Sequence, residues 1–85
     1  MQHLQLNPVL TEKFKLQMLS NDWLITHQDA GQTHLVGWGY EIFWQKAEST
    51  VILRYTNKQD SEVALLQISS VVFSDIEDMI RLLND

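Results

Sequence analysis

The sequence YEIFWQKAESTVILRY occupies residues 40–55 and determines the fold, because it is typical of two strands joined by a tight turn at residues 46–49. Pairing Gln45 with Thr50 sets Glu41 opposite Arg54, and opposite charges that meet across strands support this register. The same register gives four further pairs: Tyr40 with Tyr55, Ile42 with Leu53, Phe43 with Ile52, and Trp44 with Val51.

A second hairpin is predicted upstream, where residues 23–28 and 33–45 flank the turn-like sequence DAGQ at 29–32. A four-residue loop would pair Trp23 with Trp38, Ile25 with Val36, and His27 with His34, all on one face. A three-residue loop would instead set Leu24 beside Val36 and Ile25 beside Leu35. We favour the first register because it segregates the aromatic side chains.

Downstream, residues 57–60 predict a turn and residues 62–69 a further strand. The chain then ends in a predicted helix. Ser74 and Glu77 have the spacing of a capping box, and the following apolar residues share one helical stripe. The stripe consists of Ile76, Met79, Ile80 and Leu83.

The N-terminal segment allows two interpretations. Asn7-Pro8 is typical of a helix start, with Asn as the cap and Pro in the first turn. Residues 13–18, however, alternate between polar and apolar side chains with the period of a strand. We slightly favour a strand from about Lys13 to Leu19, and residues 8–20 stay open between helix and strand.

Together these elements predict a single α+β domain over residues 1–85. Its architecture is an antiparallel meander of four to five strands with one C-terminal helix packed on one face. A short N-terminal helix is possible instead of the first strand. The expected core face carries the aromatic side chains of the paired strands.

Composition restricts the possible functions. The 85 residues contain no cysteine, which excludes disulfides and thiolate metal sites and favours a reducing, cytoplasmic location. The first 20 residues lack the apolar stretch of a secretory signal, and no window is apolar enough to span a membrane. The net charge of −5 disfavours binding to nucleic acid or to anionic lipid.

Candidate chemistry is sparse. His27, His34 and Asp29 could approach one another, but two imidazoles and one carboxylate fall short of a zinc site. The sequence holds no nucleophile elbow, phosphate-binding loop or zinc-protease motif. We therefore expect no enzyme activity, no catalytic residue, no cofactor and no metal.

The opposite face of the sheet carries the candidate interaction site, which consists of Leu35, Gly37, Gly39, Phe43 and Ile52. One helix has only one apolar stripe, so it cannot cover both faces. We expect a small, acidic interaction or structural module that acts through this face as a homodimer or by capping a protein partner. A rival cover is the N-terminal segment with Leu4, Leu6, Val9 and Leu10. The alternative function is a small-molecule-binding domain with an aromatic-lined pocket between sheet and helix.

Overall fold

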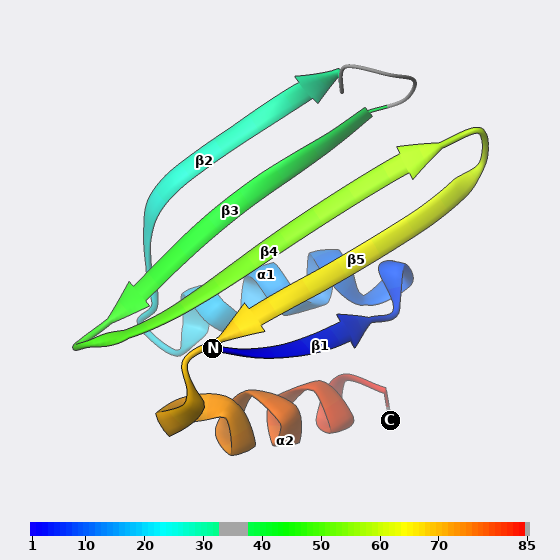
Figure 1. Ribbon diagram of the computed structural model, residues 1–85. Helices are drawn as coiled ribbons and strands as arrows, with labels where there is room; N and C mark the ends of the chain where they lie inside the picture. Colours follow the sequence, from blue (N-terminus) through cyan, green and yellow to red (C-terminus); the bar gives the residue numbers. More distant parts are fainter. Residues whose placement is uncertain (33–37, 85) are drawn as a thin grey trace.

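The computed structural model describes residues 1–32 and 38–84. The chain runs through β1 (Gln2–Leu6), a short 3-10 turn η1 (Pro8–Leu10), α1 (Thr11–Ser20), β2 (Leu24–Gln32), β3 (Trp38–Lys46), β4 (Ser49–Lys58), β5 (Ser61–Ile68), a second turn η2 (Ser70–Val72) and α2 (Phe73–Leu83). The strands form one antiparallel sheet in the order β1-β5-β4-β3-β2, with β1 and β2 at its edges (Figure 1). The α+β class and the antiparallel sheet are as predicted.

The central hairpin has the predicted register from Gln45↔Thr50 to Tyr40↔Tyr55. Only Ala47 and Glu48 separate the paired ends of β3 and β4, and Ala47 has a φ of 54°. That left-handed conformation is typical of two-residue hairpins, whose twist matches that of the sheet. The next turn has positive φ at Gln59 and Asp60, and the following strand begins one residue earlier than predicted.

Both helices contribute to a core on one face of the sheet. Phe14 and Met18 of α1 and Ile76 and Met79 of α2 pack with inward side chains of the strands. Phe14 meets Trp44 edge to face, with the ring centroids 5.6 Å apart. The largest fully buried strand side chains are Leu6, Ile42, Trp44, Val51, Leu53, Leu66 and Ile68. The predicted stripe of α2 faces this core, with Ile80 and Leu83 at its margin.

The prediction of a strand at 13–19 is wrong, because these residues lie in α1. The Asn7 side chain accepts a hydrogen bond from the Val9 amide at 3.2 Å, so Asn7-Pro8 marks the start of helical structure, as the alternative interpretation predicted. The misleading alternation came from Leu16, whose side chain is exposed on the outside of the helix. A first strand is nevertheless present at Gln2–Leu6, and it pairs with β5.

The predicted register of the first hairpin is also wrong. Residues 29–32 are not a turn but the end of β2, where Asp29 lies opposite Glu41 and Gly31 opposite Gly39. His27 pairs with Phe43, and the register shifts at Thr26 through a bulge. Gly31, which suggested the turn, lies within β2. The predicted partners Val36 and His34 lie outside the described residues.

The helix α2 begins at Phe73 rather than after Ser74, and no side chain caps it. Its first turn continues directly from η2, which ends at Val72. Ser74 therefore lies inside the first turn, where it cannot act as the N-cap. The predicted capping box is not formed.

Candidate functional site

The face of the sheet opposite the two helices is called the open face from here on. The predicted N-terminal cover does not lie on it, because Leu4, Leu6 and Leu10 pack with the core on the helical side, and Val9 is exposed. The side chains that alternate with the core residues point to the open face from all five strands.

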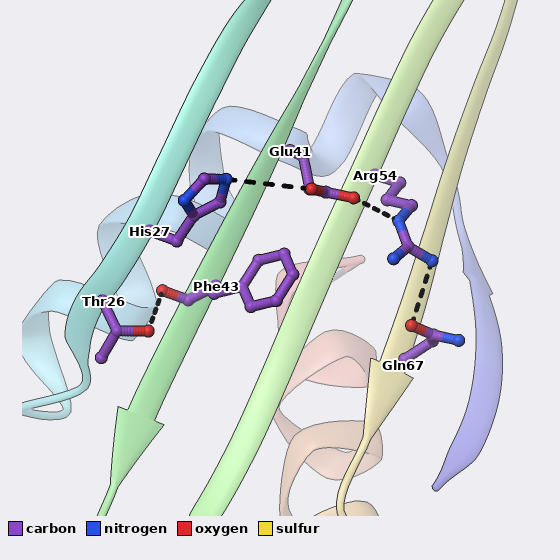
Figure 2. A network of polar contacts seen from close by, with 6 residues as sticks. All are labelled: Thr26, His27, Glu41, Phe43, Arg54 and Gln67. Atoms are coloured by element: carbon purple, nitrogen blue, oxygen red, sulfur yellow. Dashed lines mark hydrogen bonds and ion pairs between the residues drawn. The ribbon is translucent and has the colours of Figure 1, made fainter.

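A row of polar side chains crosses the whole open face, with one residue from each strand. Its members, in spatial order, are His27, Glu41, Arg54, Gln67 and His3. The Arg54 guanidinium donates to the Glu41 carboxylate and, at 3.1 Å, to the Gln67 side-chain oxygen (Figure 2). His27 Nε2 lies 4.0 Å from the other Glu41 oxygen, and Gln67 Nε2 lies 2.9 Å from His3 Nε2.

The carboxylate of Glu41 has a neighbour on each side within this row. Glu41 is engaged by Arg54 on one side and approached by His27 on the other, so both its oxygens have a cationic or polar neighbour. Arg54 is 49% exposed and Glu41 32%, which leaves their remaining hydrogen-bonding capacity accessible to solvent. An exposed pair of this kind contributes only about 0–1 kcal/mol to stability.

Apolar side chains flank this row. Phe43 and Ile52 are register partners on β3 and β4, and Leu65 lies opposite Arg54 on β5. Ile52 is only 8% exposed, Phe43 is half-buried, and Leu65 is 49% exposed. The His27 ring also meets Phe43 edge to face, with the centroids 5.1 Å apart. The open face therefore combines an apolar patch with a hydrogen-bonded polar row.

Gly39 was predicted as part of a groove floor, and its surroundings explain it differently. A Cβ atom at this position would lie 2.5 Å from the Tyr55 carbonyl oxygen and 3.4 Å from Thr56 Cα. The absence of a side chain thus permits the close approach of β3 to β4. The other two predicted interface residues, Leu35 and Gly37, lie outside the described residues.

Within residues 1–32 and 38–84, no group of three His, Asp or Glu side chains could hold a metal ion. His27 lies against Phe43 and Glu41. The suggested neighbour His34 falls outside the described ranges. The described part of the site offers hydrogen bonding and apolar contact.

Several aromatic side chains lie along β3 and β4 on the side of the core. Trp44 is fully buried, while Tyr40 and Tyr55 stack at 5.0 Å and Trp38 meets both edge to face. The Tyr55 hydroxyl donates to Glu62 at 2.6 Å. This hydrogen bond, together with burial, raises the pKa of Tyr55 above its ordinary value.

A pocket of about 390 Å³ lies on the helical side, between α2 and the turn that joins β3 to β4. Trp23 forms one wall, and Ile76 and Met79 form the apolar floor. Lys46 and Asp75 supply opposite charges at its rim. The Lys46 ammonium donates to the Asn21 carbonyl at 2.7 Å and lies 5.9 Å from the Trp23 ring centroid.

Sequence reasoning missed the half of the polar row that comes from β1 and β5. His3 was not considered because residues 2–6 were not recognised as a strand. Gln67 lies in the predicted strand at 62–69, but without its partner strand it was not recognised as part of a polar row. The alternation in QHLQL was the available signal, since Leu4 and Leu6 share one parity and His3 and Gln5 the other. Leu65 was left out of the candidate interaction site, because the β5 sequence is apolar on both faces and its alternation is blurred.

Comparison with known proteins identified no relative: no protein-family model, curated protein or solved structure matches the chain. In the part of the chain that the structure describes, neither helix is long and apolar enough to cross a membrane.

Proposed function

We propose that this protein is a small, non-catalytic interaction module that binds another protein chain through the open face of its sheet. The observation that carries the proposal is the combination of Phe43, Ile52 and Leu65 with the polar row on a face that neither helix covers. Protein interfaces generally place apolar contacts beside hydrogen-bonding groups, and arginine is enriched among them.

The polar row supports binding to a defined partner rather than unspecific adhesion. Its groups are already oriented by Glu41, Arg54 and Gln67, so a partner meets fixed donors and acceptors. Holding these side chains in place before binding reduces the entropy lost on association. The occupant is either a second copy of the chain or a different protein, and oligomeric state separates the two.

The test compares Leu65→Glu with the matched control Leu82→Glu. Leu65 is 49% exposed on the open face, and Leu82 is 73% exposed on α2, so both variants should fold. We expect the open-face variant to lose at least tenfold in affinity for the partner chain, measured by sedimentation for a second copy or by quantitative co-purification for a different protein. Equal binding by both variants would refute the proposal.

A second candidate function is small-molecule binding, favoured by the pocket beside Trp23. Its apolar floor and the Lys46 ammonium suit a small aromatic carboxylate. Titration with indole-3-acetate, followed by the NMR signal of the Trp23 indole, tests this. Saturable shifts that disappear in Lys46→Gln would support the pocket as a binding site, and unchanged spectra at millimolar ligand would argue against it.

A further inference from the structure

The edge strand β2 lies beside an apolar strip of α1, away from the open face. On the helical side, Leu16 and Leu19 are 64% and 71% exposed, and Ile25 of β2 is 52% exposed. These three side chains line one groove of about 220 Å³, with Trp44 among the residues of its wall. The helix α1 therefore leaves the outer strand of the sheet incompletely covered.

The free edge of β2 has few of the features that normally prevent strand pairing. The strand is nine residues long, and its sequence LITHQDAGQ contains no proline, lysine or arginine. Proline, charged side chains and bulges are the common protections of an edge. Here the bulge at Thr26 and the charge of Asp29 are such features, and the bulge limits regular pairing to a short ladder.

We propose that two copies of the chain associate through β2, with the strands antiparallel and Gln28 on the two-fold axis. In a dimer that keeps both pairs of helices on one side of the sheet, residues that lie opposite each other must point to the same face. The axis then passes between the two copies of one residue, which lie opposite each other. An axis through His27 would set two histidines together, and one through Asp29 would set two carboxylates together. Only the axis at Gln28 places His27 opposite the partner's Asp29, twice.

This register also improves the charge environment of Asp29. Within one chain, Asp29 lies directly opposite Glu41, and like charges in that position are destabilising. His27 of the second copy would add a hydrogen-bond donor or a positive charge beside Asp29. The short ladder alone binds weakly, so burial of Leu16, Leu19 and Ile25 against the second copy would supply most of the association. Ile25 is three residues from the axis, so it would meet the other end of the partner strand rather than its own copy.

The inference is independent of the proposed function, because the dimer uses only His27 and Asp29 from the edge of the open face. Phe43, Ile52 and Leu65 stay uncovered. The sheet would extend continuously from one copy to the next, and two open faces would point in the same direction. We place the second copy at β2 rather than at the opposite edge of the sheet because β2 has nine residues available for pairing and β1 has only five.

Sedimentation equilibrium of the full chain tests the dimer, with Leu19→Glu and Asp29→Lys as interface variants and Leu65→Glu and Leu82→Glu as controls. We expect the wild type and both controls to dimerise at micromolar concentration, and each interface variant to raise the dissociation constant at least tenfold. Asp29→Lys is the more specific variant. Within the chain the new lysine lies opposite Glu41, which has the opposite charge, but across the axis it removes the hydrogen-bond acceptor and the negative charge beside His27. Its thermal unfolding at a concentration where the chain is monomeric should therefore show no loss of stability.

A wild type that is monomeric at millimolar concentration would overturn the inference and leave the open-face proposal intact. A dimer that survives both Leu19→Glu and Asp29→Lys would also overturn it. If that dimer instead dissociates in Leu65→Glu, the second copy occupies the open face, which would support the proposed function alone.

Discussion

Replacing Gly39 with alanine tests the close approach of β3 to β4 at this position. The new Cβ would lie 2.5 Å from the Tyr55 carbonyl oxygen, where about 3.4 Å or more is ordinary contact, so one of the two strands must move. Because the obstacle is backbone, no side-chain rotation can relieve it. Overpacking of this kind typically costs about 1–3 kcal/mol.

Alanine has an opposing effect on the unfolded chain. It restricts the unfolded state more than glycine does and thereby favours folding by about 0.4–1 kcal/mol. The expected net loss for Gly39→Ala is therefore about 1–2 kcal/mol. In a domain of this size each kcal/mol lowers the melting temperature by about 4–8 °C.

Urea denaturation followed by circular dichroism measures this loss, and thermal melting provides a second reading. Gln45→Ala is the control, because Gln45 is exposed on the same strand and the same face. We expect the control to change stability by less than about 0.5 kcal/mol. A Gly39→Ala variant as stable as the wild type would show that β3 and β4 do not approach each other closely at this point.

Two further predictions concern the packing of α2 and the hydrogen bond between Tyr55 and Glu62. Ile76→Ala should destabilise the protein by about 2–5 kcal/mol, and Ile80→Ala by less, because Ile76 is 3% exposed and Ile80 lies at the core margin. Urea denaturation measures both losses, and equal losses would contradict the placement of α2. Glu62→Gln should lower the pKa of Tyr55, read from its ring carbon by NMR, because the hydrogen bond to the carboxylate is the largest cause of the raised value. Since that pKa is higher in the folded state, its stabilising contribution is present below the ordinary tyrosine pKa of about 10 and is lost as pH rises further. An unchanged Tyr55 pKa in the variant would refute this assignment.

The candidate site was only partly predictable from the sequence. Phe43 and Ile52 were assigned to the correct face because their register follows from local alternation and the Glu41–Arg54 pair. The polar row also needs His3 and Gln67, which are 64 residues apart in the chain. Pairing of β1 with β5 brings them together, and nothing local to either strand specifies that partner.

The central hairpin and the apolar stripe of α2 are predictable from local sequence, because in both cases neighbouring residues supply the deciding interactions. Turn conformation at Ala47 and cross-strand pairs fix the hairpin, and the spacing of Ile76 and Met79 fixes the buried side of the helix. The choice between helix and strand at residues 11–20 depends instead on contacts with the rest of the fold. Phe14 and Met18 lie one turn apart and are both completely buried against the sheet, and that burial outweighs an alternating pattern that would suit a strand equally well.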